Sequence, residues 1–232
     1  MTGDTTISGA YTLALTGATN LSTHTGYQIC DNTILKTSTS NISSIYLGVN
    51  AGSNGSGCNN FGVGCNALKN NTSGDLNLAQ GQNALYNNTT GNFNIAQGLN
   101  ALLNNISGNY NIAQGVCALY SNTIGNYNVI QGTNAFNKNT TGSSNVVLGH
   151  YTFYSNTAGS NNVALGTCAG YYETGSNKLH IGNHKDCTLI CGDFTGKTVT
   201  IDNKLITTDF QMTNGATDDY VLTSDASGNA TW

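Results

Sequence analysis

The sequence predicts an all-β protein built as a parallel β-roll, or β-solenoid, with about 17 residues per rung. Three observations predict this fold class. The composition is rich in turn and strand formers and poor in strong helix formers. Glycines recur at a nearly constant spacing. Between them, apolar residues alternate with small or polar ones, as they do in a strand.

The composition also excludes several classes of protein. Only 8% of the 232 residues are charged, against roughly 25% in an ordinary soluble domain. The net charge of −4, with no arginine, argues against nucleic acid as a partner. No stretch approaches the roughly 20 apolar residues of a membrane span, so membrane insertion is not expected. Proline is absent and Asn occurs 36 times, which disfavours helices, while the many aliphatic and aromatic residues disfavour disorder.

Two glycine series, in phase with each other, define the repeat. The first follows each short apolar run, and it contains Gly48, Gly64, Gly81, Gly98, Gly115, Gly132, Gly149 and Gly166. Its positions rise by 16 once and then by 17 six times, and Gly182 follows at a further step of 16. The second series contains Gly74, Gly91, Gly108, Gly125, Gly142 and Gly159. We expect both series to lie at turns, where glycine supplies backbone conformations that other residues avoid.

Two short strands per rung are expected between these turns. In the segment before each first-series glycine, flanking residues such as the apolar Ile95 alternate with a small residue such as Ala96 with period two. The segment after it repeats Asn-Ala-Leu, as in residues 83–85, and is interpreted as a second strand. Rungs would then stack at about 4.8 Å, with aliphatic, alanine, asparagine and glutamine ladders along the axis.

Three regions follow from this pattern. Residues 44–192 form the solenoid array, and residues 1–43 form an N-terminal β cap or attachment region, because a solenoid must hide its open ends. Residues 193–232 form a C-terminal β region. The seven cysteines are scattered and odd in number, which favours free, mostly buried thiols over a disulfide framework.

A single chain of this kind is expected to associate with copies of itself. One rung offers only a few apolar side chains, and their burial barely offsets the entropy of ordering the rung. An exposed flat face with so little charge would otherwise risk aggregation.

Particular units resemble known repeats. Residues 44–51 (SIYLGVNA) and 161–166 (NNVALG) resemble the head repeat of trimeric autotransporter adhesins. The longer unit G-x-N-A-L-x-x-N-T-T-G-x-x-N resembles arrays in fibre-like proteins of bacteria, phages and large viruses, which often end in an endosialidase-type intramolecular chaperone. Residues 220–232 resemble the segment that precedes that chaperone in tail fibres. The resemblance implies a left-handed β-roll and a homotrimer. The chaperone itself is absent from residues 1–232, so none of its catalytic residues can be assigned.

Few residues carry candidate site chemistry. His180, His184, Cys187 and Cys191 are the weak candidates for a metal site, although packing roles are favoured because their spacing matches no established zinc motif. Tyr86, Tyr120 and Tyr154 could contact a receptor or glycan, with packing as the alternative. Residues 32–172 hold one acidic residue, Asp75, whereas glycoside cleavage needs two acids close together. No catalytic residue and no cofactor is therefore expected.

The function expected from these features is structural. The chain would be a trimeric shaft segment of a phage or viral fibre or spike that presents or spaces a receptor-binding surface on the virion. Its partners would be itself, a virion or tail attachment protein, and a host receptor or glycan. An adhesin fragment at a cell surface is the alternative, and a solenoid enzyme acting on polysaccharide is a third, less favoured one.

Overall fold

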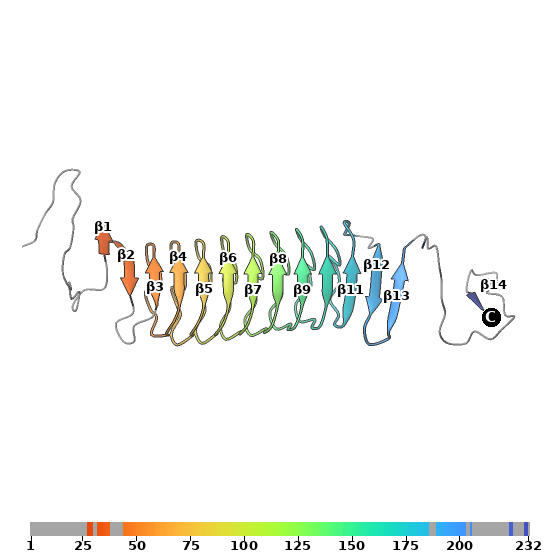
Figure 1. The fold of residues 1–232 in the computed structure, drawn as a ribbon, viewed down its shortest axis with the longest axis horizontal. Helices are drawn as coiled ribbons and strands as arrows, with labels where there is room; N and C mark the ends of the chain where they lie inside the picture. The colour runs from red at the N-terminus through yellow and green to blue at the C-terminus, as the bar shows by residue number, and fades with distance from the viewer. Residues whose placement is uncertain are drawn as a thin grey trace, which may run out of the picture.

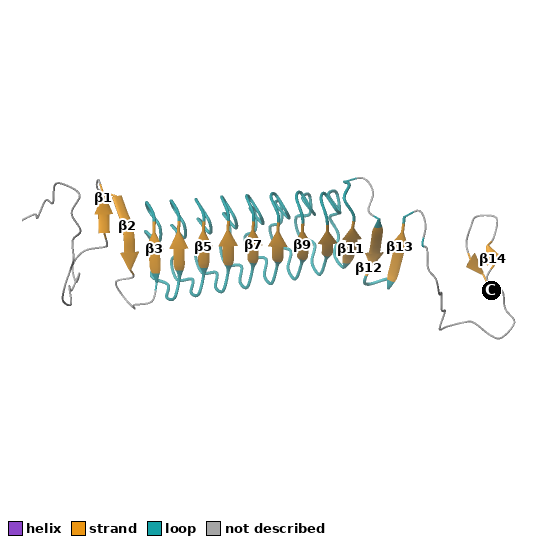
Figure 2. Cartoon of the chain, turned by 45° about the horizontal axis from the view of Figure 1, so that its top comes forward, coloured by secondary structure: helices purple, strands orange, loops and turns teal. Residues whose placement is uncertain are grey.

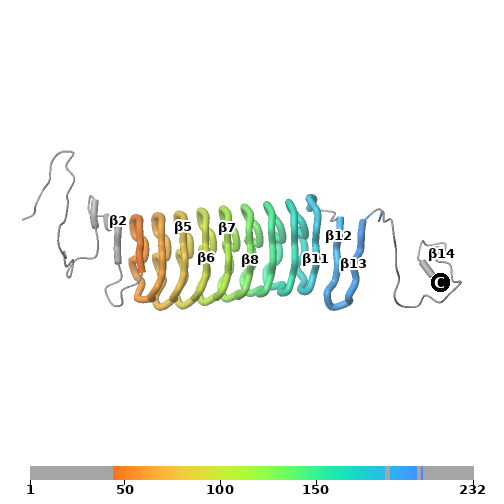
Figure 3. The backbone as a smooth tube through the Cα atoms, in the orientation of Figure 1, coloured from red at the N-terminus to blue at the C-terminus, as the bar shows by residue number. Residues whose placement is uncertain are grey.

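The protein is a long rod of stacked rungs. The computed structural model describes residues 27–29, 32–37, 44–185, 189–202, 205, 223–224 and 230–231. In Figure 1 the strands stand side by side along the long axis in the order in which they occur in the chain. The tube in Figure 3 shows each rung from 44 onward as one coil of the backbone.

One sheet of 13 strands contains almost all of the strands in the described part of the chain. Strands β3 to β11 pair in parallel, each with the next along the chain. Their bounds are β3 Ile45–Leu47, β4 Phe61–Val63, β5 Leu78–Gln80, β6 Ile95–Gln97, β7 Ile112–Gln114, β8 Val129–Gln131, β9 Val146–Leu148, β10 Val163–Leu165 and β11 Lys178–Ile181.

The register confirms the predicted rung. Ile95 pairs with Ile112, and Gln97 with Gln114, so one strand spacing corresponds to 17 residues. The first and last parallel steps pair Ile45 with Phe61 and Val163 with Leu179, which are 16 residues apart. The all-β parallel solenoid is therefore shown, together with its repeat length.

The prediction of a second strand in each rung is wrong. Residues after the first-series glycine form consecutive turns, drawn in teal in Figure 2. In the rung of Gly81, Asn83 and Leu85 have φ values of 57° and 51°. Ala84 N–H donates to the Gly81 carbonyl (3.3 Å) and Tyr86 N–H to the Asn83 carbonyl (3.3 Å), closing two successive β-turns.

This segment is not a strand because the N–H groups of alternate residues point in opposite directions along the rod axis. Asn83 N–H donates to the Cys65 carbonyl in the preceding rung (2.9 Å), whereas Leu85 N–H donates to the Ala101 carbonyl in the following rung (3.1 Å). Every second residue is left-handed, so the backbone coils while its polar groups still bond along the axis. Asn tolerates this conformation readily and a bulky Leu rarely does, which is why the Leu position carries no sequence signal for it.

The interior of each rung is narrow and apolar. In β6, Ala96 is fully buried and its neighbours Ile95 and Gln97 face outward. Ala101 and Leu102, from the turn segment of the same rung, close the interior from the other side and are fully buried. In strands β3 to β10 the middle residue is therefore the inner one, whether it is small, as Ala96 is, or large, as Tyr46 and Ile130 are, and the residues on either side face outward.

Volume changes between rungs compensate one another. Gly52 stands where most rungs carry Leu or Phe, and the buried Tyr46 ring fills the space, since a Cβ on Gly52 would lie 2.6 Å from that ring. Gly170 holds the same position near the other end and is covered by the rings of Phe153 and His180. Close packing is thus maintained at both ends of the array.

Two rows of buried asparagine run through the interior. Asn105 Nδ2 donates to Asn88 Oδ1 (2.8 Å) and to the Gly108 carbonyl (2.9 Å). From the second row, Asn94 Nδ2 donates to Asn77 Oδ1 (3.1 Å) and to the same Gly108 carbonyl (2.8 Å). The two rows contain Asn71, Asn88, Asn105, Asn122, Asn139 and Asn156, and Asn60, Asn77, Asn94, Asn111, Asn128, Asn145 and Asn162. The predicted Asn ladder is therefore present, and its buried amides are satisfied.

Glycine is required in both series because the backbones of neighbouring rungs approach each other closely at these positions. Gly98 has φ +137°, and a Cβ there would lie 2.5 Å from the Gly115 carbonyl oxygen. A Cβ on Gly108 would overlap the Gly125 carbonyl oxygen and Asn105 Oδ1. The predicted turn glycines, Gly64, Gly81, Gly98, Gly115, Gly132, Gly149 and Gly166, all have φ between +113° and +140°.

Antiparallel strands flank the parallel stack at both ends. β2 (Asn32–Thr37) pairs antiparallel with β3 and with β1 (Tyr27–Ile29). At the other end, β12 (Ile190–Asp193) pairs antiparallel with β11 and with β13 (Thr198–Ile201). A separate pair joins β14 (Thr223–Ser224) to β15 (Ala230–Thr231). No helix in the described part of the chain is long and apolar enough to cross a membrane.

Candidate functional site

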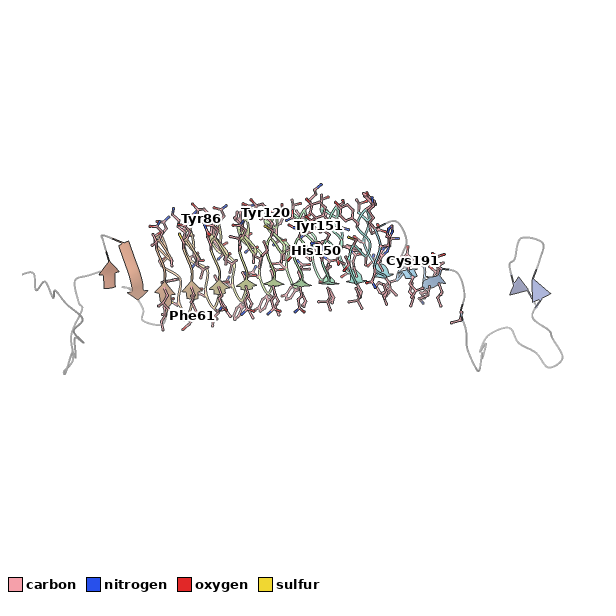
Figure 4. The ribbon with its side chains drawn as sticks, turned by 90° about the horizontal axis from the view of Figure 1, so that it is seen from above. Phe61, Tyr86, Tyr120, His150, Tyr151 and Cys191 are labelled. Atoms are coloured by element: carbon pink, nitrogen blue, oxygen red, sulfur yellow. The ribbon has the colours of Figure 1, made fainter. Side chains whose placement is uncertain are left out.

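The rod presents two different outward surfaces. We call the first the strand face; it consists of the side chains five, three and one residues before each first-series glycine, from residue 45 to 165. The second, the turn face, consists of the outward side chains two, five, six and eight residues after that glycine. In Figure 4, Tyr86, Tyr120 and Tyr151 of the turn face lie along the edge opposite Phe61 of the strand face.

The strand face is mostly apolar and carries no charge. Its exposed members include Phe61 (42% exposed), Phe93 (44%) and Tyr127 (61%). Phe93, Tyr110 and Tyr127 stack on one another, with ring centroids 4.7 and 5.1 Å apart and planes within 4° and 6° of parallel. Between residues 45 and 165, all of which the structure describes, none of its three rows holds a charged residue. Glutamine side chains form a ladder along it, with Gln97 Nε2 donating to Gln80 Oε1 (3.2 Å).

The turn face carries the three tyrosines singled out from the sequence. Tyr86 lies beneath the ammonium of Lys69, 5.4 Å from its ring centroid. Tyr120 lies two rungs further on, in the same row. Tyr154 stacks on Tyr171 at 5.2 Å. The structure therefore places the three in one row but in separate surroundings.

A cluster of aromatic rings occupies the C-terminal part of the turn face. Tyr151 contacts Tyr154 and Tyr171 with ring centroids 5.3 and 6.3 Å apart, and Tyr171 contacts Tyr172 at 4.8 Å. Burial and the neighbouring Tyr154 raise the pKa of Tyr171. The Lys138 ammonium lies 5.0 Å from the Tyr154 ring centroid.

An open groove of about 440 Å³ crosses three rungs of the turn face. Its lining alternates amide, hydroxyl and aliphatic groups, and no charged side chain contributes to it. The lining residues are Asn87, Thr89, Asn104, Ile106, Ser121 and Thr123. Sequence reasoning missed this groove. The available signal was a break in two rows, where Ser121 replaces the Asn of earlier rungs and Ile106 replaces a Thr.

The structure describes three of the four weak metal-site candidates, His180, His184 and Cys191. His180 lies in β11 opposite Cys191 of β12. Its Nε2 lies 3.2 Å from Glu173 Oε2, and its ring meets the edge of Phe153 at 5.5 Å. His184 is exposed, and Cys187 lies outside the described residues. No group of three or more His, Cys, Asp or Glu side chains among the described residues could hold a metal ion.

Ion pairs stabilise the C-terminal strands instead. Lys178 Nζ lies 2.7 Å from Asp193 Oδ2, and the amides of Gly196 and Thr195 donate to Asp193 Oδ1. The Lys178 hydrogen bond, helped by these amides, lowers the pKa of Asp193 to about 2. Burial raises the pKa of Glu173, but hydrogen bonds from the Gly175 amide and from His180 outweigh it, so the pKa lies below its usual value.

The cysteines are free but not buried where the structure describes them. Cys58, Cys65, Cys117, Cys168 and Cys191 form no disulfide, and each is exposed or partly exposed. The expectation of mostly buried thiols is therefore wrong for these five, because their positions face outward. Cys30 lies outside the described residues, as Cys187 does. So do residues 1–26 and most of residues 206–232, including most of the segment that resembles the chaperone-preceding region.

Comparisons with known proteins add no relative. No protein-family model, no curated protein and no solved structure matched the chain.

Proposed function

We propose that the chain is the shaft segment of a fibre or spike in which three copies pack side by side. The observation that carries this proposal is the uncovered strand face. Parallel sheets are almost always covered on both faces. Here one face packs against the turn segments, while the other exposes Phe61, Phe93 and Tyr127 to solvent in the single chain.

Copies of the same chain suit this face better than an unrelated partner does. The face has no charged residue from 45 to 165, so identical copies meet without repulsion, and it offers no charge pattern for steering a different protein. An apolar interface of this kind is typical of permanent homo-oligomers. The repeat's resemblance to trimeric adhesin heads and fibre arrays supports three as the number of chains and a left-handed coil.

The shaft would hold a receptor-binding surface away from a virion and attach to a virion or tail protein. The second candidate is a cell-surface adhesin fragment. The cluster of Tyr151, Tyr154 and Tyr171 on the turn face favours it, because Tyr rings and hydroxyls suit contact with glycans. A chaperone encoded after Trp232 would support the fibre, and a membrane anchor encoded there would support the adhesin.

The oligomeric state tests the proposal. Light scattering should give three times the 24.1 kDa chain mass for the wild-type protein. Tyr127→Lys combined with Val129→Lys places charge on the strand face and should lower that mass. The matched control, Tyr120→Lys on the turn face, should leave it unchanged. A folded wild-type monomer, or equal masses for the two variants, would overturn the proposal.

A further inference from the structure

We propose that the groove on the turn face is a binding site for an uncharged carbohydrate. The inference rests on the proposed function in one respect, because packing through the strand face leaves the turn face open to solvent. An outer ladder of exposed or partly exposed asparagines, Asn54, Asn70, Asn87 and Asn104, runs along the turn face. The groove lies where this outer ladder ends, and its open hydrogen-bonding groups arise from that ending.

The ladder ends at Asn104. In preceding rungs each amide donates to the next along the chain, as Asn70 Nδ2 does to Asn87 Oδ1 (3.1 Å) and Asn87 Nδ2 to Asn104 Oδ1 (3.1 Å). The next position holds Ser121, whose side chain is shorter. Among the described residues, Asn104 Nδ2 has no acceptor and the Ser121 hydroxyl has no partner.

The walls supply acceptors and an apolar patch. Thr89 and Thr123 donate their hydroxyl protons to the carbonyls of Ile106 (2.8 Å) and Thr140 (2.9 Å), so their oxygens remain free to accept. Between them the Ile106 side chain is 45% exposed. The groove therefore offers an amide donor, hydroxyl groups that can donate or accept a hydrogen bond, and one aliphatic contact.

This combination matches a sugar ring, which carries hydroxyls around its edge and C–H groups on its face. The volume of about 440 Å³ falls within the usual range for small-ligand sites, roughly 300–1,000 Å³. Phosphates, sialic acids and other anions are disfavoured because no cation lines the groove. The nearest Lys in this row, Lys138, is turned toward the Tyr154 ring. The ligand class is therefore a neutral oligosaccharide.

A panel of immobilised neutral and acidic oligosaccharides tests the proposal with the full chain. We expect binding to neutral members that persists at about 1 M salt, where charges are screened within about 3 Å. Ser121→Asn should restore the ladder, fill the groove and weaken binding at least about tenfold. Its fold should be kept, because Asn occupies the same position in the four preceding rungs.

Ser155→Asn is the matched control, since it makes the same change in the same row outside the groove. It should bind like the wild-type protein. The proposal is overturned if no neutral oligosaccharide binds, if only acidic ones bind, or if Ser121→Asn binds as well as Ser155→Asn. Light scattering on the same samples separates the two claims. If the protein is a trimer but binds no sugar, only the carbohydrate-binding proposal is rejected. If it binds sugar as a monomer, only the proposed trimeric shaft is rejected.

Discussion

At the residue scale, glycine and asparagine perform the tasks that a larger apolar core performs elsewhere. Glycine lets the backbone of one rung contact the carbonyl of the next, as at Gly91 and Gly108. Buried asparagine satisfies those carbonyls and its own row together, as Asn94 and Asn105 do at Gly108. The low charge and high Asn content of the sequence thus have a structural cause.

Gly98→Ala should destabilise the protein by at least about 2 kcal/mol, because the new Cβ meets the Gly115 carbonyl at 2.5 Å and φ is +137°. Gly196→Ala is the control, since its nearest contacts would be at 3.8 Å and its φ is not positive. Urea unfolding at one fixed protein concentration measures both changes. Equal stability of the two variants would show that the rungs do not approach as closely as described.

Asn105→Ala should lower the free energy of unfolding by roughly 3 kcal/mol. It leaves Asn88 Oδ1 without its donor and Asn122 Nδ2 without one of its acceptors, and each buried unpaired group costs about 1–3 kcal/mol. Asn70→Ala removes equivalent bonds from the outer ladder, where water can replace them, so it should cost less than about 1 kcal/mol. A larger cost at Asn70 than at Asn105 would contradict the assignment of inner and outer rows.

At the element scale, the strands could be predicted because one glycine marks the end of each. The inner side of each strand could not be predicted in the same way. An alternation of period two does not tell which of the two series of side chains faces inward. Ala96 is inside and Ile95 outside, yet the same inner position holds Ile130 and Val147 in later rungs, so the size of a residue does not mark the inner side either. The turn segments were misread because Leu85 adopts a left-handed conformation that its side chain does not favour. The groove escaped prediction because it arises from one interrupted row.

The C-terminal strands should lose stability in acid before the rungs do. The pKa of Asp193 is lowered to about 2, against about 3.9 for an unfolded Asp, so its contribution is complete above about pH 4 and is lost as the pH falls toward 2. The lowered pKa of Glu173 acts in the same direction. Amide exchange, corrected for its intrinsic pH dependence, should show opening of β12 and β13 while β6 stays protected. Uniform exchange of β6 and β12 across this range would refute the expectation.

At the scale of the whole molecule, stability is expected to be a sum over rungs and the contacts between neighbours. Each rung in the middle of the rod contacts its neighbours in the same register, and the side chains repeat with it. A rung is therefore a removable unit, provided that the removal keeps the phase of both glycine series. This property distinguishes a solenoid from a globular β domain of the same length.

The most direct test is deletion of one rung. Removing residues 99–115 joins Gly98 to Val116 in phase, so the variant should fold cooperatively, with an unfolding midpoint close to that of the wild-type protein. Removing residues 99–113 instead leaves Gln114 and Gly115 as extra residues, which shifts every row and should lower the midpoint sharply. Equal unfolding midpoints for the two deletions would contradict the 17-residue rung as the structural unit.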